Sequence, residues 1–431
     1  MKTYSMKEID NELYLGKFRL SDLAKEYKTP LYVYDELGIN NKIDIFKKSF
    51  ISDSFITTIV YASKAFLAPY LCKLLENKVL SIDAVSIGDL LLLKQAKFPM
   101  ERVIFHGNNK SIEELNLCLD LNVKYIVIDS LRELKRLDIL TQEKKIKCNT
   151  LFRVNPGIEA HTHEFIQTSL LDSKFGESIN DSLIFEKIVD IYKHSPYLFL
   201  KGFHAHIGSQ INVSSSFGKE VEVLLDFIEM FQKVNGYNVR VLDIGGGFGI
   251  KYLDTDTPLD LEETLQNVVK IVENKMKTRG LFIEELLIEP GRSIVGDSGI
   301  TLYTCGGSKQ TFSKKNLCIV DGGMADNIRP ALYRANYSVD IANRVNGSEK
   351  YVYDVVGKYC ESGDIIARNV ILGKVKDKDI IVTHSTGAYC YSMSSNYNGS
   401  LRPAVIFVKD DKVKEAIKRE TYEDLAKTYI F

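Results

Sequence analysis

The chain has 431 residues, with 56 Lys plus Arg against 57 Asp plus Glu and a formal net charge of −1. This length suggests two or three domains, and the balanced charge excludes a global field that would attract nucleic acid or an anionic membrane. Seven cysteines without a CxxC pair argue against a secreted disulfide framework and a structural zinc site. We therefore expect reduced thiols and a small-molecule partner.

The N-terminal stretch MKTYSMKEIDNELYLGKF is too charged for a signal peptide. No apolar run approaches the ~20 residues that a membrane span needs. The sequence therefore predicts a cytoplasmic protein that acts away from membranes.

Short β-rich apolar runs alternate with longer helix-like segments from about residue 38 to 295. The runs cover residues 55–64, 79–84, 102–106, 125–129, 150–154, 202–208, 240–247 and 286–291. Such a series over about 250 residues predicts an α/β fold, a (β/α)₈ barrel of the TIM type. The active site of these barrels lies at the C-terminal ends of the strands. We therefore expect residues that end the runs to meet, namely Lys64, Asp83, His106, Arg153, His206 and Glu289.

Lys64 ends an apolar run in TIVYASKAFLAP, residues 58–69. Lysine is rarely buried without a partner, so one interpretation is a side chain that extends from the strand end into water. The other is a desolvated amine that is ready to form a Schiff base. The position of Lys64 among the strand ends favours the second interpretation.

The rhythm of the sequence shortens after residue 296, where strand-like runs are closed by turn residues. This pattern predicts an all-β domain, a sandwich or barrel, to which PLYVYD (30–35) adds a strand. We therefore expect two domains, the barrel over 38–295 and a β domain built from 1–37 plus 296–431.

Three motifs at strand ends carry chemistry. GGGFG (245–249) can bring backbone amides close to a phosphate, but it lacks the GxGxxG spacing of a dinucleotide site. HAHIGS (204–209) places two histidines on one strand face without a recognisable third ligand, which favours ring stacking or packing over a metal site. EPGR (289–292) offers a carboxylate for a protonated pyridine nitrogen. Together with Lys64, these features predict a pocket for pyridoxal phosphate (PLP).

The order of the motifs resembles the fold-type III PLP-dependent decarboxylases, and within them the diaminopimelate decarboxylases, over nearly the whole chain. The matching segments are YASKAF, HGNNKS (106–111), DSKFG (172–176), HAHIGSQ, DIGGGFGI, EPGR, IRPALY (328–333), CESGD (360–364) and GAYCYSMSSNYN (387–398). CESGD and GAYCYSMSSNYN are the more specific to this branch. The resemblance implies decarboxylation of meso-2,6-diaminopimelate to L-lysine and CO₂, the last step of lysine biosynthesis.

The resemblance also implies roles for single residues in cofactor binding. Lys64 would hold PLP through a Schiff base, His206 would stack on its ring, and Glu289 would bond its nitrogen. The remaining expected cofactor contacts are Asp83, Arg153, Ser209, Gly246, Gly247, Gly291, Arg292 and Tyr389.

The substrate residues implied by the resemblance are Arg292, Arg329, Tyr333, Glu361 and Tyr389. Two guanidinium groups suit a distal carboxylate, which an ornithine or lysine decarboxylase would not need to bind. Cys360 would return a proton to the carbanion, and its CESGD loop would enter the partner's pocket, which implies a homodimer with shared active sites.

Several alternatives stay open from sequence alone. Decarboxylases of the same fold act on ornithine, arginine, carboxynorspermidine or a carrier-bound glutamyl group. An alanine racemase or a non-enzymatic PLP carrier is a further possibility.

One departure from the family pattern is Ser169, which stands where relatives carry glycine. If that position needs a positive φ, Ser169 would cost roughly 1 kcal/mol or re-route the loop.

Overall fold

The computed structural model describes residues 2–158, 173–347 and 349–430. The chain divides into two compact units. The first, here the β unit, comprises Met1–Lys42, Ile250–Thr257 and Arg292–Phe431. The second, here the barrel unit, comprises Ile43–Gly249 and Pro258–Gly291.

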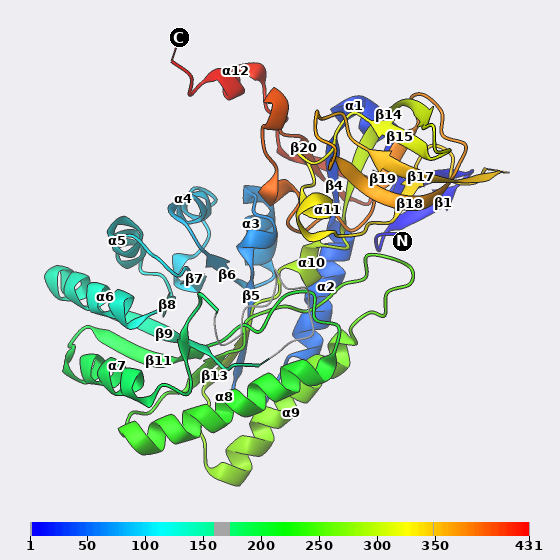
Figure 1. Cartoon of the computed structure of the whole chain (residues 1–431). Helices are drawn as coiled ribbons and strands as arrows, with labels where there is room; N and C mark the ends of the chain where they lie inside the picture. Colours follow the sequence, from blue (N-terminus) through cyan, green and yellow to red (C-terminus); the bar gives the residue numbers. More distant parts are fainter. Residues whose placement is uncertain (1, 159–172, 348, 431) are drawn as a thin grey trace. The chain divides into compact units, whose positions relative to one another are not determined.

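The barrel unit is built on parallel strands that pair in the order β9, β11, β12, β13, β5, β6, β7 and β8, and β8 pairs with β9 to close the barrel (Figure 1). Their bounds are β5 Ile56–Tyr61, β6 Ser81–Ala84, β7 Val103–Phe105, β8 Tyr125–Ile128, β9 Cys148–Asn155, β11 Leu198–His204, β12 Val241–Asp243 and β13 Glu285–Ile288. The short strand β10, Glu177–Ser178, pairs with β9. These strands confirm the predicted (β/α)₈ barrel.

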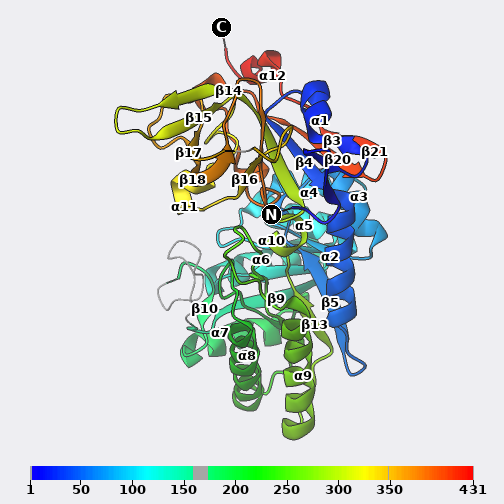
Figure 2. The same ribbon diagram turned by 90° about the vertical axis from the view of Figure 1, so that its right-hand side faces the viewer.

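Helices alternate with the barrel strands along the chain, beginning with one that precedes β5. They are α2 Glu36–Ser49, α3 Pro69–Asn77, α4 Ile87–Gln95, α5 Ile112–Leu121, α6 Leu131–Lys144, α7 Ser182–His194, α8 Ser214–Asn235 and α9 Leu261–Arg279. Helices α8 and α9 run side by side in Figures 1 and 2. Several starts are capped by a side chain that accepts an N–H bond from the first turn, at Ser86, Ser111, Ser130, Asp181 and Asp260.

The strands β6, β8 and β13 are buried at every residue, as expected for a parallel sheet that is covered on both faces. Apolar side chains of β8 and β13 contribute to a cluster with those of other barrel strands, which includes Val60, Ile104, Val127 and Leu287. The barrel is therefore a packed core, and reactive side chains are left for the strand ends.

Glu220 is a fully buried carboxyl on α8, and both of its oxygens lack hydrogen-bond partners among the described residues. Burial raises its pKa well above the usual value. Because the folded pKa exceeds the unfolded one, protonated Glu220 favours the folded state at low pH, and this contribution is lost as the pH rises.

We expect Glu220→Gln to unfold at about the same temperature as the wild type at pH 4 and at a temperature roughly 3 °C or more higher at pH 8. Calorimetry at both pH values measures the difference. Glu222→Gln makes the same charge change at an exposed position of α8 and is the matched control. An equal gain for Glu220→Gln at pH 4 and pH 8 would contradict the assigned ionisation.

The β unit contains a three-stranded sheet, β1 Met6–Ile9, β2 Glu12–Leu15 and β3 Phe18–Arg19, and a nine-stranded sheet. The strands of the larger sheet are β4 Leu31–Asp35, β14 Gly299–Gln310, β15 Asn316–Val320, β16 Val339–Ile341, β17 Lys350–Val356, β18 Ile365–Gly373, β19 Ile380–Thr383, β20 Ala404–Lys409 and β21 Lys412–Ile417. Strand β4 pairs with β14 and β20. The predicted N-terminal contribution to the β fold is thus confirmed.

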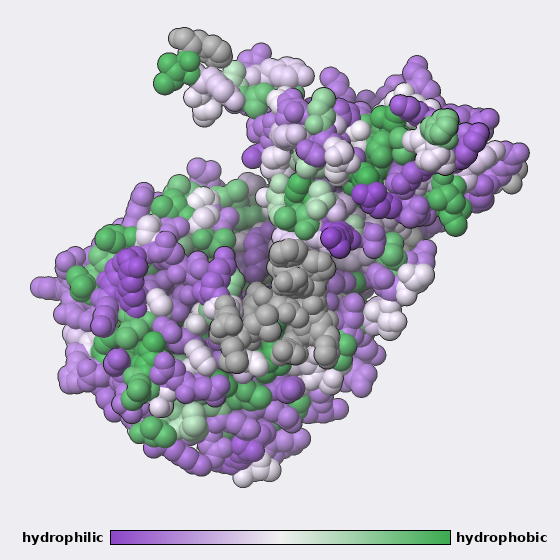
Figure 3. All heavy atoms as spheres, viewed as in Figure 1, coloured by the Kyte–Doolittle hydropathy of each residue, from purple (hydrophilic) through white to green (hydrophobic). Residues whose placement is uncertain are grey.

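Four short helices complete the β unit: α1 Leu20–Tyr27, α10 Arg292–Val295, α11 Arg329–Tyr333 and α12 Tyr422–Ala426. In the face shown in Figure 3, hydrophilic side chains cover most of the surface and hydrophobic ones are scattered. No helix in the described part of the chain is both long enough and apolar enough to cross a membrane.

Candidate active site

Lys64 lies on a short 3₁₀ turn, Ser63–Ala65, that directly follows β5. Ser63 and Ala65 are buried, whereas Lys64 is exposed. The residues of the chain itself therefore do not desolvate this amine, and the expected Schiff base with Lys64 stays a prediction. The amine remains accessible to a reactant.

Asp83 fixes the backbone of this turn from the neighbouring strand β6. Its Oδ1 accepts a hydrogen bond from the Ser63 amide at 2.6 Å. Burial raises the pKa of Asp83 to about 6, with a further contribution from Glu289 that the nearby His106 and Lys64 oppose. The structure thus places Asp83 beside the turn that carries Lys64.

Glu289 follows β13 and has an imidazole near each carboxylate oxygen. His204 Nε2, at the end of β11, lies 3.3 Å from Oε2 and forms a hydrogen bond. His106 Nε2, just after β7, lies 2.8 Å from Oε1, but the N–H does not point along a normal hydrogen bond. All three side chains are buried. Their ligand atoms lie within 4.8 Å of one another, close enough to share a metal ion, but the direct contacts account for the cluster.

The charge in this cluster lies on Glu289. Burial alone would raise its pKa, but the contacts with His106 and His204 lower it well below the usual value. Burial lowers the pKa of His204 to about 3, so this imidazole is neutral and donates through Nε2. Burial and the nearby Glu289 raise the pKa of Asp243 well above its usual value.

The glycine-rich loop 245–247 lies against the loop that follows β11. The Gly246 amide donates to His206 Nδ1 at 3.1 Å, and the Ile211 amide donates to the Gly247 carbonyl at 2.9 Å. A Cβ at Gly246 would lie 2.1 Å from the Glu289 carbonyl oxygen, so no side chain is tolerated there. The structure therefore brings the loop that contains His206 and Ile211 against Gly246 and Gly247.

Arg153, on β9, is partly buried with its guanidinium 4.3 Å from the centre of the Phe175 ring. Burial lowers its pKa, and the nearby Asp129 and Glu289 raise it. Gly291, another expected cofactor contact, closes the barrel unit, and a Cβ there would lie 2.8 Å from the Ala62 Cβ. Arg153 is thus near the charged cluster, and Gly291 lies against the segment just before Lys64.

In the β unit, Arg292 and Arg329 begin two short helices and are both buried. Their guanidinium carbons lie 4.8 Å and 5.7 Å from the centre of the Tyr389 ring. Arg329 also lies 5.3 Å from the ring centre of Tyr333. The structure therefore gathers four of the five predicted substrate residues into one cluster.

Two further tyrosines hold these arginines. Arg292 Nη1 donates to the hydroxyl of Tyr252, and Arg329 Nε donates to that of Tyr337 at 2.8 Å. The rings of Tyr252 and Tyr337 meet edge to face at 5.4 Å. Among the described residues, no carboxylate forms an ion pair with Arg329. This part of the β unit is therefore a cationic cluster built from guanidinium groups and phenols.

Cys360 and Glu361 lie on an exposed turn after β17. The Asp364 carboxylate organises this turn by accepting the amides of Tyr359 at 2.8 Å and Met324 at 2.6 Å. All seven cysteines lie in the described part of the chain, and Cys360 is the exposed one. It is therefore the thiol most accessible to a reactant.

Sequence reasoning missed several residues of these clusters. His106 was expected among the strand ends but its contact with Glu289 was not, and Asp243 was signalled only as the first residue of DIGGGFGI. Nothing in the local sequence pointed to Tyr252 or Tyr337. Ser169 lies outside the described residues, so the structure does not test its expected effect.

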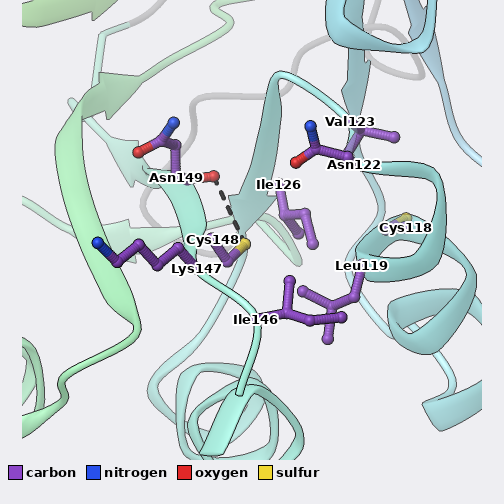
Figure 4. A pocket seen from close by; sticks show the side chains of 9 residues that line it. All are labelled: Cys118, Leu119, Asn122, Val123, Ile126, Ile146, Lys147, Cys148 and Asn149. Atoms are coloured by element: carbon purple, nitrogen blue, oxygen red, sulfur yellow. Dashed lines mark hydrogen bonds between the residues drawn. The ribbon is translucent and has the colours of Figure 1, made fainter. Parts of the chain in front are cut away.

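A small cavity of about 30 Å³ lies at the other end of the barrel strands (Figure 4). It is lined by Cys118, Leu119, Asn122, Val123, Ile126, Ile146, Lys147, Cys148 and Asn149. These residues lie near the starts of β8 and β9. The cavity therefore contains none of the candidate residues.

Comparisons with known proteins show which family the chain resembles. Residues 37–296 match the family described as "Pyridoxal-dependent decarboxylase, pyridoxal binding domain". Diaminopimelate decarboxylase of Bacillus subtilis is 42% identical, covering 94% of this chain and 92% of that protein. The Staphylococcus aureus enzyme is 41% identical, covering 96% and 97%.

A crystal structure of diaminopimelate decarboxylase from M. jannaschii in complex with L-lysine is similar in fold and length. It has a TM-score of 0.93 and 29% identity and covers 100% of this chain and 99% of that one. The matched cofactor domain, the curated relatives and the shared fold agree, and the chain belongs to the diaminopimelate decarboxylase family of PLP-dependent decarboxylases.

Proposed function

We propose that the chain converts meso-2,6-diaminopimelate to L-lysine and CO₂ in the cytoplasm, as the last step of lysine biosynthesis. The observation that carries this proposal is the buried guanidinium of Arg329, which is surrounded by phenols and has no carboxylate ion pair among the described residues. A buried cation of this kind suits a second carboxylate on the substrate.

The barrel unit has features that fit PLP. Glu289 Oε1 is buried without an aligned hydrogen bond among the described residues, which suits the N–H of a protonated pyridine. The glycine loop leaves no room for side chains, which suits close approach of a phosphate to the backbone. When bound, PLP supplies an electron sink for the electron pair that the departing CO₂ leaves behind.

The residues of the barrel unit then have separate roles. Lys64 supplies the primary amine that holds the cofactor and yields it to the substrate amine. His206 covers the ring, and Ser209, Gly246 and Gly247 bind the phosphate. Asp83 and Arg153 position the lysine turn and balance the charge of the buried cluster.

The β unit binds the end of the substrate that is far from the reacting carbon. Arg292 and Arg329 bind the distal carboxylate, and Tyr333 and Tyr389 flank it. Glu361 accepts the distal ammonium. We also assign Arg292, Gly291 and Tyr389 to the contacts with PLP, as their motifs predict.

The direct test is a competition in which the PLP-loaded protein is given meso-diaminopimelate, ornithine, arginine and carboxynorspermidine together. We expect lysine as the only new amine by mass spectrometry. A different amine would overturn the assigned substrate and leave the cofactor assignment standing. Absence of any product, with PLP bound, would favour a carrier protein.

We further propose a homodimer in which the loop that bears Cys360 completes the site of the partner. The exposed turn around Cys360 supports this assignment, because a proton donor on the surface of one chain needs a partner to be shielded from water. Tyr422 and Ile430 near the C-terminus are 70% and 101% exposed, which suits a surface that another copy covers.

We expect Cys360→Ala to lower turnover by about 10²-fold, because its Sγ–H no longer returns a proton to the substrate Cα. Mixed with Lys64→Ala subunits and allowed to exchange, it should regain up to about a quarter of wild-type activity, because half of the dimers are mixed and each has one intact site. Cys318→Ala, which changes a buried thiol, is the control. An unchanged rate and product for Cys360→Ala, or no recovery on mixing, would contradict the shared site.

A further inference from the structure

The cluster of His106, His204 and Glu289 brings together three strand ends that are not neighbours in the barrel. In the pairing order, β12 separates β11 from β13, and β5 and β6 separate β13 from β7. Side chains that follow β7, β11 and β13 therefore meet only across the inside of the barrel. Each imidazole reaches a different oxygen of Glu289.

The tautomer of His204 follows from its surroundings. Its Nε2 bonds Glu289 Oε2, and its buried Nδ1 has no hydrogen-bond partner among the described residues. A proton on Nδ1 would be a buried donor without an acceptor, which is costly. Neutral His204 with its proton on Nε2 satisfies the contact, and this imidazole is a donor to Glu289.

His106 is held in place by the loop that follows it. Lys110 is buried, and its Nζ bonds the Gly107 carbonyl and Glu133 Oε1, each at 2.7 Å. The ring of His106 also packs against that of His204, with centroids 4.9 Å apart and an interplanar angle of 69°. The loop after His106 is thus fixed by bonds of its own, and the two imidazole rings pack against each other beside Glu289.

We propose that His106 and His204 are positioning residues that keep Glu289 as a carboxylate in one orientation, so that Oε1 accepts the N–H of a protonated pyridine ring. This inference rests on the proposed role of Glu289. Without these two imidazoles, buried Glu289 would take up a proton and meet the ring nitrogen through a neutral hydrogen bond. Such a bond is about half as strong as a charge-assisted one.

The test compares two cofactors on apoprotein variants by equilibrium dialysis. One is PLP, and the other is deazapyridoxal phosphate, in which carbon replaces the ring nitrogen. We expect His204→Leu and His106→Leu each to weaken PLP roughly tenfold and the deaza analogue less than about twofold. His204→Gln keeps an N–H donor and should regain part of the loss. His194→Gln, on the surface of the same unit, is the control.

The protonation of the ring is a second readout. In solid-state ¹⁵N NMR of protein loaded with ring-¹⁵N PLP, we expect a protonated nitrogen in the wild type and His204→Gln, and a neutral one in the leucine variants. Two independent leucine variants keep the test intact if one of them fails to fold.

Distinct outcomes separate the possible failures. Equal weakening of both cofactors, or no weakening of either, would overturn the positioning role. A ring nitrogen that stays protonated in both leucine variants would overturn it as well. Wild-type protein that binds both cofactors equally would instead overturn the role of Glu289 on which the inference rests.

Discussion

Lys64→Ala is expected to reduce turnover by more than about 10³-fold, because the variant lacks the primary amine that forms the covalent bond to the cofactor. The variant should still bind PLP through the ring and phosphate contacts. After reduction with borohydride, the cofactor should dialyse away from the variant but stay covalently attached to the wild type. The accessible position of Lys64 on the Ser63–Ala65 turn is the structural basis for this expectation.

Lys73→Ala is the matched control, because Lys73 is an exposed lysine on the following helix α3. It should retain activity and covalent capture of the cofactor. Turnover by Lys64→Ala with PLP bound would remove this lysine from the mechanism. Loss of activity with a lowered unfolding temperature would indicate damage to the turn, so the unfolding temperature is measured alongside.

The barrel could be predicted from the sequence because its strands are local signals. The run YIVID contains the fully buried β8, and LLIEPG overlaps β13 and ends at the residues of the site. The strand expected at 202–208 lies four residues too late, because β11 begins at Leu198 and ends at His204. The apolar stretch continues beyond the strand, and only pairing with β9 and β12 ends it.

The environment of the site residues could not be predicted in the same way. Nothing in the local sequence indicated that Lys64 would lie exposed on a single turn of 3₁₀ helix. The contact between His204 and Glu289 joins residues 85 positions apart, and that between Arg292 and Tyr252 joins residues 40 apart. No local pattern encodes such pairs, because the tertiary fold alone brings them within reach.

Specificity for a second carboxylate is the property that most depends on such long-range contacts. Tyr337 fixes the Nε of Arg329, and the rings of Tyr333 and Tyr389 flank its guanidinium. Since meso-diaminopimelate yields L-lysine, the centre that loses CO₂ has D configuration. D-lysine therefore presents the same reacting centre and the same distal amine but lacks the distal carboxylate.

Arg329→Leu is expected to lower kcat/KM for meso-diaminopimelate by roughly 10³-fold, because the distal carboxylate would be desolvated without its partner. Turnover of D-lysine, measured as cadaverine in the wild type and the variant, should fall less than about threefold or rise, since an unpaired buried guanidinium no longer opposes it. Arg368→Leu, at an exposed position of β18, should change neither value and is the matched control.

The comparison of the two substrates separates recognition from folding. A variant that is merely damaged loses both activities in proportion. A variant that lacks the residue binding the distal carboxylate loses activity toward meso-diaminopimelate alone. Equal losses for meso-diaminopimelate and D-lysine would therefore assign Arg329 a structural role and leave the choice of substrate to Arg292 and Glu361. A selective loss would mean that the buried charge, held by Tyr337 and two flanking rings, is what separates this substrate from amines with a single carboxylate.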